Sequence, residues 1–319
     1  MNTLADWWSR ETVVQKFNEL TTKYPTLIKK EIVGKSHLGA NVPLYRIGTN
    51  PTVKILYDGC IHGASSWSAH TCYNLAKWLL ENQSEEAKSA LRRLQTLIIP
   101  MLNYDRYGLS RKNANGVDLN RNFVSGWCTG STDPSSDYYK GVSAGSEKET
   151  QFMRNLFSKE KPLVYVNFHT YGGDPVTMGE IRRVNYGDTS HRNNSLAILN
   201  KTVGLCIKRG VSPPKITYVY TSPNGYAVAD AYALAKSYSF LWEQWHEMPT
   251  QADVDGTMTN RLICFQIAVD QLYGVEPPTP GEILSANIGA TFGLIIIIPY
   301  ITTYSREVIR QWKKQTSQS

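Results

Sequence analysis

The 319-residue sequence has no CxxC motif, and its five cysteines are scattered and odd in number. This pattern matches neither a disulfide framework nor a thiolate zinc cluster. The formal net charge is +7, but the basic residues form no stripe interleaved with aromatic residues. A nucleic-acid partner is therefore not expected. The first twenty residues contain no apolar segment behind a basic start, so no secretory signal peptide is seen.

The central part of the chain alternates between two kinds of segment. Short β-branched or aromatic runs, such as VKILYD, TLIIPML and PLVYVNFH, are separated by helical stretches such as WSAHTCYNLAKWLL. The alternation predicts an α/β domain with a mixed, mostly parallel β-sheet flanked by helices on both faces. Near the N-terminus, Val13, Phe17 and Leu20 fall on one stripe of a predicted helix that ends before Pro25. With no internal repeat, we expect a single domain over residues 1–274.

The C-terminal end has a different composition. Residues 275–282 are a polar, proline-containing linker, and residues 283–304 carry no charge. That run is long enough to cross a bilayer, which takes roughly 20 apolar residues. The basic tail at residues 305–319 is typical of the inner side of a membrane. We therefore expect a C-terminal hydrophobic helix that anchors the chain in a membrane, with the globular domain extracytoplasmic. The alternative is a buried or surface-docked helix, because the run contains Pro299.

Two histidines and a glutamate lie where predicted strands end. His62 follows VKILYD, His169 ends PLVYVNFH, and Glu243 lies in SYSFLWEQW. Ligand sites of open α/β sheets gather where strands end and loops begin. Neutral imidazole nitrogens suit zinc. Hydrolysis of an amide needs an activated water, a Lewis acid or oxyanion partner, and a proton acceptor, and these residue types can supply such groups.

Four sequence blocks, taken in order, resemble the zinc carboxypeptidase family, the carboxypeptidase A-like metallopeptidases or funnelins. They are DGCIHG, NYDRYGLSRKNANGVDLNRNF, VNFHTYGG and YSFLWEQW, and the most specific part is GVDLNRNF at residues 116–123. The resemblance implies a hydrolase that removes C-terminal residues from peptides or proteins. It also implies one zinc ion per chain and the α/β fold of this family.

The resemblance assigns a role to each matching residue. His62 and His169 resemble zinc ligands, and Asp118 resembles the carboxylate that orients the first histidine. Arg111 resembles the arginine that polarises the scissile carbonyl. Glu243 resembles the general base that activates water.

Other residues resemble the family's substrate-binding groups. Asn120 and Arg121 match the pair that holds the C-terminal carboxylate of the peptide, a contact for which guanidinium geometry is suited. Tyr171, just after the last histidine, matches an aromatic subsite residue. These positions imply that the ligand is a peptide with a free C-terminus.

The specificity region is matched by Tyr220, which resembles the mobile tyrosine that covers bound substrate, although Tyr218 competes for the same place. The floor of the pocket would then lie near Ala227 or Val228. Because both side chains are apolar, we expect an uncharged side chain at the substrate C-terminus to be favoured over a basic one.

One residue of the family pattern is missing. The first zinc turn of the family is His-x-x-Glu, and here it is His62-Gly-Ala-Ser65, with no acidic residue before Glu81. A neutral hydroxyl is a poor zinc ligand compared with a carboxylate, histidine or thiolate. The sequence therefore leaves the third metal ligand open.

Three alternatives follow from the missing carboxylate. Zinc could bind more weakly to the two histidines and water, with activity retained. Another side chain, such as His70 or Cys60, could complete the site. The protein could instead be a pseudoenzyme that binds peptide C-termini through Arg121 and Asn120 without efficient catalysis. The retained chemical groups favour an enzyme that hydrolyses the C-terminal peptide bond; a different amide hydrolysis on the same fold is a further possibility.

Overall fold

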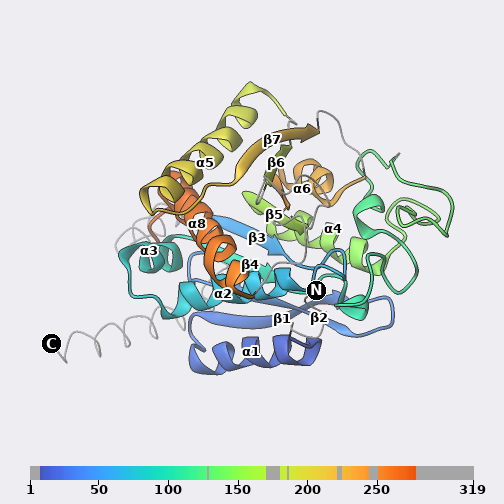
Figure 1. Cartoon of the computed structure of the whole chain (residues 1–319), viewed down its shortest axis with the longest axis horizontal. Coiled ribbons are helices and arrows are strands. Elements are labelled where there is room, and N and C mark those ends of the chain that lie inside the picture. The colour runs from blue at the N-terminus through green and yellow to red at the C-terminus, as the bar shows by residue number, and fades with distance from the viewer. Residues whose placement is uncertain are drawn as a thin grey trace, which may run out of the picture. The chain divides into compact units, whose positions relative to one another are not determined.

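The computed structural model describes residues 8–127, 129–169, 180–184, 187–220, 225–243 and 251–277. The chain divides after Glu276, and the described elements belong to the first unit, Met1–Glu276. Eight strands form one sheet in the order β1-β2-β4-β3-β5-β8-β6-β7 (Figure 1). The strands are β1 (Ile28–Lys35), β2 (Asn41–Ile47), β3 (Lys54–Asp58), β4 (Gln95–Ile99), β5 (Val164–His169), β6 (Glu180–Val184), β7 (Lys215–Tyr220) and β8 (Tyr238–Glu243).

The middle of the sheet is parallel and its flanks are mixed. Strands β4, β3, β5 and β8 run parallel to one another, and β6 is parallel to β7. The β1–β2, β2–β4 and β6–β8 pairs are antiparallel. The predicted mixed, mostly parallel sheet is therefore confirmed. Its parallel centre brings the carboxyl ends of β3, β5 and β8 to one edge, where ligand sites of such sheets are found.

Helices cover both faces of the sheet. The helices are α1 (Arg10–Lys23), α2 (Trp67–Glu81), α3 (Glu85–Arg93), α4 (Lys148–Glu160), α5 (Thr189–Lys208), α6 (Ala227–Ala235), the short α7 (Gln251–Asp253) and α8 (Thr259–Tyr273), with single turns η2 (Tyr104–Arg106), η3 (Leu119–Arg121) and the π-helical η4 (Val254–Met258). Apolar residues of α1, α2, α3, α5 and α8 share one core cluster, and those of α4 and α6 belong to another.

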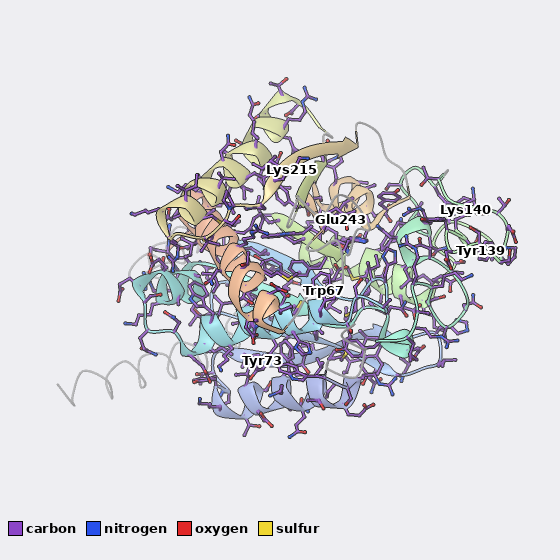
Figure 2. All side chains as sticks on the ribbon, viewed as in Figure 1. Trp67, Tyr73, Tyr139, Lys140, Lys215 and Glu243 are labelled. Atoms are coloured by element: carbon purple, nitrogen blue, oxygen red, sulfur yellow. The ribbon has the colours of Figure 1, made fainter. Side chains whose placement is uncertain are left out.

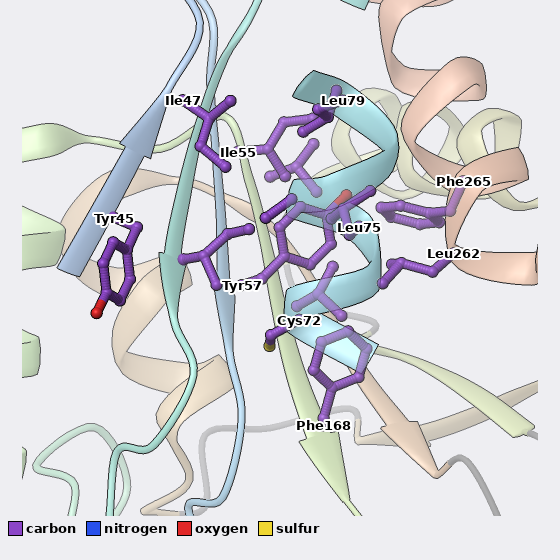
Figure 3. Close-up of a cluster of buried hydrophobic side chains, with 14 of the residues drawn as sticks. Tyr45, Ile47, Ile55, Tyr57, Cys72, Leu75, Leu79, Phe168, Leu262 and Phe265 are labelled. Carbon is purple, nitrogen blue, oxygen red and sulfur yellow. The ribbon is translucent and has the colours of Figure 1, made fainter. Parts of the chain in front are cut away.

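The alternation of side chains along the strands builds both core clusters. In β3, Ile55 and Tyr57 belong to the cluster with α2 and α8, and Leu56 between them belongs to the opposite one. Figure 3 shows Tyr57 on the sheet side of Leu75 of α2, and Phe265 of α8 belongs to the same cluster. A strand buried on both faces needs a continuous apolar run, which explains the sequence KILY.

The first helix follows the predicted pattern. The side chains of Val13, Phe17 and Leu20 are buried, and Ser9 caps α1 by accepting a hydrogen bond from the N–H of Thr12 at 3.2 Å. The ring of Phe17 stacks on Tyr45 of β2 with centroids 4.2 Å apart. Amphipathic spacing therefore places α1 against the sheet, as expected.

The prediction of a membrane anchor is corrected. Among the residues that the structure describes, no helix is both long enough and apolar enough to cross a bilayer. Helix α5 has 20 residues but contains Arg192 and Lys201, and α8 has only 15 residues. A span takes roughly 20 apolar residues. The run at residues 283–304 lies outside the described residues. The transmembrane helix, and the extracytoplasmic placement inferred from it, therefore have no support.

A buried carboxylate links α4 to the antiparallel side of the sheet. Glu160, at the end of α4, accepts hydrogen bonds from Arg46 of β2 at 3.1 Å and from Lys54 of β3 at 2.8 Å. Arg46 also binds Glu31 of β1 at 3.0 Å. Burial alone would raise the pKa of Glu160, but hydrogen bonds from the two cations hold it at about 2. The network thus favours the ionised carboxylate.

We predict that Glu160→Gln lowers the free energy of unfolding by on the order of 2–4 kcal/mol at neutral pH, because two partly buried cations lose their shared partner. The folded-state pKa of Glu160 lies below its ordinary value of 4.5, so its contribution is complete above about pH 4.5 and is lost as the pH falls towards about 2. Urea unfolding at pH 7 and pH 3 measures both effects, and the difference between wild type and variant should narrow at pH 3.

The matched control is Glu11→Gln, which removes an exposed ion pair with Arg10. It should change the stability by less than ~0.5 kcal/mol. An equal effect of the two substitutions at pH 7 would contradict a structural role for the Glu160 network.

Candidate active site

His62 lies on a tight turn that follows β3. The N–H of Asn103 donates to the carbonyl of Cys60 at 2.9 Å, which ties the turn to the segment after β4. A Cβ on Gly63 would lie 2.1 Å from the carbonyl oxygen of Arg106, so only glycine fits this approach. The turn therefore holds His62 in a fixed place at the carboxyl edge of the sheet.

Asp118 connects His62 to Arg111. One oxygen of Asp118 lies 3.0 Å from Nε2 of His62 and also accepts the N–H of Asn120 at 3.0 Å. The other oxygen accepts two hydrogen bonds from Arg111, at 3.1 and 2.7 Å. Burial alone would raise the pKa of Asp118, but His62 and Arg111 outweigh this effect and hold the pKa below its ordinary value. Asp118 is thus an ionised, fully buried carboxylate.

His169 ends β5 and is held by two asparagine amides. Nδ2 of Asn120 lies 3.2 Å from Nε2 of His169, and Oδ1 of Asn167 contacts the same nitrogen. The amide of Asn167 donates to buried Asp58 at 2.6 Å. Burial raises the pKa of Asp58 to about 7, although donors from Asn167 and Tyr165 lower it. A chain of polar contacts therefore runs from the end of β3 to His169.

The two histidines face each other at one site. The ring centroids of His62 and His169 are 4.9 Å apart, and both rings are buried. Burial lowers the pKa of His62, and burial, aided by His62 and Arg111, lowers that of His169 well below its ordinary value. Both shifts favour the neutral imidazole.

The described residues do not fit a three-ligand zinc site. Within the described part of the chain, no three His, Cys, Asp or Glu side chains converge as a metal site. Ser65, whose N–H donates to the carbonyl of His62 at 2.9 Å, offers only a neutral hydroxyl. Nη1 of Arg111 lies 3.4 Å from Nδ1 of His62, the nitrogen that Asp118 does not engage. A fixed cation beside this nitrogen disfavours a metal cation there.

Cys60 and His70, the two alternative ligands near His62 in the sequence, make other contacts. The thiol of Cys60 donates to the carbonyl of Ser65 at 3.3 Å, and burial raises its pKa to about 12, which disfavours the thiolate that zinc needs. The ring of His70 stacks on Trp8 with centroids 3.8 Å apart, and its Nε2 accepts the N–H of Trp8 at 3.2 Å. Cys60 thus favours the neutral thiol, and His70 contacts Trp8.

Arg121 lies beside this cluster and contacts aromatic rings. Its guanidinium carbon is 4.4 Å from the ring centroid of Tyr226 and 5.5 Å from that of Tyr138. Its Nη1 donates to the carbonyl of Asn120 at 3.0 Å. Among the described residues, no carboxylate lies within ion-pair distance of Arg121. The charge of Arg121 also acts on both histidines, since it lowers their pKa values.

Glu243 lies at the end of β8, next to His169. The two residues are paired in the parallel register of β5 and β8, and Glu243 is 8% exposed. Figure 2 shows Glu243 near the centre of the molecule, at the carboxyl edge of the sheet. The register therefore brings the predicted base next to the second histidine.

The remaining predicted residues are three tyrosines and two small apolar residues. Tyr171 lies outside the described residues, and Tyr220 and Tyr218 lie on β7 with side chains that are not described. Ala227 and Val228 are fully buried at the start of α6. These two positions belong to the core cluster that includes α4.

Sequence reasoning did not identify four residues that the structure places around the site. Asp58 and Asn167 support His169, and Tyr138 and Tyr226 contact Arg121. A polar residue at the end of a buried strand is a signal that could have drawn attention to Asp58. The contacts of the two tyrosines depend on long-range folding and leave no local signal.

The comparisons with known proteins agree with the fold. A family profile described as zinc carboxypeptidase matches residues 13–204. The chain belongs to the zinc carboxypeptidase family. Carboxypeptidase B of Rattus norvegicus is 28% identical over 189 residues, covering 50% of this chain and 44% of that protein. Human mast cell carboxypeptidase A is 32% identical over 191 residues, with coverage of 50% and 44%. The chain thus matches these zinc carboxypeptidases over less than half of their length.

Several solved structures share the fold. Bovine thrombin-activatable fibrinolysis inhibitor, in complex with tick carboxypeptidase inhibitor, superposes with a TM-score of 0.67 at 20% identity, covering 83% of this chain and 97% of that chain. Carboxypeptidase A from Helicoverpa armigera gives a TM-score of 0.68 at 20% identity, with coverage of 85% and 75%. At this identity the likeness establishes the α/β architecture alone.

We predict that Ser65→Glu raises the affinity for zinc by about tenfold or more, because it supplies a carboxylate at the family's third ligand position. The measurement is a competition titration against a chromophoric zinc chelator, with circular dichroism to verify folding. Ser66→Glu is the matched control, since Ser66 is an equally buried neighbour on the same turn. Tight binding of one zinc ion by the wild type, or an equal gain from Ser66→Glu, would contradict our interpretation of the ligand set.

Proposed function

We propose that the chain binds peptides or proteins by their free C-terminus, in a carboxypeptidase-type site in which Arg121 is the anchor. Family membership supports a ligand of this class. The geometry around the two histidines supports binding more strongly than zinc-dependent hydrolysis, because the third metal ligand is replaced by Ser65. Binding of peptide C-termini is therefore the first candidate function, and hydrolysis of the C-terminal peptide bond is the second.

The observation that carries this proposal is the different environment of the two arginines. Arg111 is paired with the buried carboxylate of Asp118 through two hydrogen bonds. Arg121 instead contacts the rings of Tyr226 and Tyr138 and a backbone carbonyl. A guanidinium stacked on an aromatic face keeps its N–H donors in the plane of the group, where they suit a carboxylate. Arg121 is consequently the cation best able to bind an incoming carboxylate.

The role of Asn120 in this proposal differs from that of Arg121. The amide nitrogen of Asn120 faces His169, and its Oδ1 accepts the N–H of Ala227 at 3.0 Å. Asn120 is 2% exposed. In this arrangement Asn120 positions His169 and the start of α6, and Arg121 makes the contact with the ligand.

Hydrolysis of the C-terminal peptide bond is the second candidate function. The register that pairs Glu243 with His169 favours it, because a carboxylate at this place can accept a proton from water. Arg111 would face the developing oxyanion, a role for which a preorganised cation is suited. The described ligand set does not fit zinc, so Glu243 and Arg111 are the groups that this second function would use.

We predict that a fluorescent hexapeptide with a free C-terminal carboxylate binds more tightly than the same peptide with a C-terminal amide. Arg121→Ala should raise the Kd for the free acid by about tenfold or more, since hydrogen bonds to charged groups contribute about 1.5–3 kcal/mol. Fluorescence polarisation measures both peptides. Arg106→Ala, which removes an exposed arginine of η2, is the matched control and should leave both Kd values unchanged. Equal binding of acid and amide by the wild type would overturn the proposal.

Hydrolysis has its own test. A peptide mixture is incubated with the full chain and added zinc, and mass spectrometry detects the loss of single C-terminal residues. Glu243→Gln is run in parallel, because it removes the proposed proton acceptor with little change in volume. Trimming by the wild type that disappears in the variant would establish the second function. Equal traces from both proteins would leave binding as the function.

A further inference from the structure

Tyr138 lies over both arginines of the candidate site. Its ring centroid is 5.0 Å from the guanidinium carbon of Arg111 and 5.5 Å from that of Arg121. Both distances are within the roughly 6 Å at which a cation and an aromatic ring attract each other. The side chain is far from buried, since Tyr138 is 53% exposed. One exposed ring thus contacts the two cations that serve different parts of the proposed ligand.

The loop that carries Tyr138 is fastened on both sides of this residue. The carbonyl of Tyr138 accepts the N–H of Ser131 at 2.8 Å, and its N–H donates to Oγ of Ser136 at 3.1 Å. The next residue, Tyr139, accepts the N–H of Asp118 at 2.8 Å through its carbonyl. Figure 2 shows Tyr139 and Lys140 on this loop. The backbone contact to Asp118 therefore ties the position of the Tyr138 ring to the centre of the site.

Gly130 shows how closely this loop approaches Arg121. Its φ is +98°, and a Cβ there would lie 2.8 Å from the carbonyl oxygen of Tyr138 and 3.2 Å from the side chain of Arg121. Such a position requires glycine. The loop is therefore packed directly against Arg121, and this packing holds the Tyr138 ring close to the guanidinium group.

The ring face offsets an electrostatic cost of the site. Two like charges that contact the same ring repel, and among the described residues no carboxylate lies within ion-pair distance of Arg121. The face of an aromatic ring carries partial negative charge, so it stabilises both cations without competing for their N–H donors. A carboxylate in the same place would compete with the ligand, whereas an aromatic ring would not.

We propose that Tyr138 is a positioning residue of the carboxylate subsite. Its ring holds the guanidinium groups of Arg111 and Arg121 in the orientation in which Arg121 binds the C-terminal carboxylate of a peptide. This inference rests on the proposed function. It extends that function by assigning recognition of the C-terminus to a ring in the 129–146 loop as well as to the arginines.

The test uses the acid and amide forms of the hexapeptide with the full chain. Tyr138→Leu should weaken binding of the free acid by roughly fivefold to tenfold, since two cation–aromatic contacts are lost, and should leave binding of the amide unchanged. Tyr138→Phe should bind within about twofold of wild type, because the ring face is retained. Tyr139→Leu is the matched control, since its backbone carbonyl, the atom that contacts Asp118, is preserved.

The possible outcomes separate this inference from the function on which it rests. If the wild type binds acid and amide equally, the proposed function fails. If the wild type prefers the acid and Tyr138→Leu binds it as tightly, the function stands and the role of Tyr138 is overturned. An equal loss in Tyr138→Phe would also overturn it, because the hydroxyl rather than the ring face would then matter. An equal loss in Tyr139→Leu would assign the effect to loop packing and overturn it as well.

Discussion

The buried carboxylate of Asp118 is the interaction on which the candidate site depends. It accepts hydrogen bonds from the backbone of Asn120 and from Arg111, and it binds His62, while its own N–H donates to the carbonyl of Tyr139. An ionised carboxylate can be buried only when such donors surround it. The side chain of Asp118 therefore connects the turn after β3, the loop of Arg111 and η3. Its backbone N–H adds a contact to the loop that contains Tyr138 and Tyr139.

The zinc carboxypeptidase fold places the residues of the candidate site. The parallel register of β5 and β8 still pairs His169 with Glu243, and the tight turn at Gly63 still presents His62. Ser65 offers only a neutral hydroxyl on that turn. The guanidinium groups of Arg111 and Arg121 supply positive charge beside it, and such groups bind carboxylates well.

Much of the fold could be predicted from the sequence, because strand and helix periods are local properties. Alternating runs gave the α/β sheet, and the block around Asp118 identified the segment that brings His62 and Arg111 together. Composition alone was a poor guide to the C-terminal run, where the expected membrane helix found no support. The stacking of Tyr138 on Arg121 could not be predicted, since it depends on the path of a long loop.

The amide of Asn120 joins two parts of the molecule that could otherwise adjust separately. Its nitrogen faces His169 at the end of β5, and its oxygen accepts the N–H of Ala227 at the first turn of α6. An amide is planar and short, so a displacement of either partner strains the other contact. The position of His169 is consequently linked to the first turn of α6 through a single side chain.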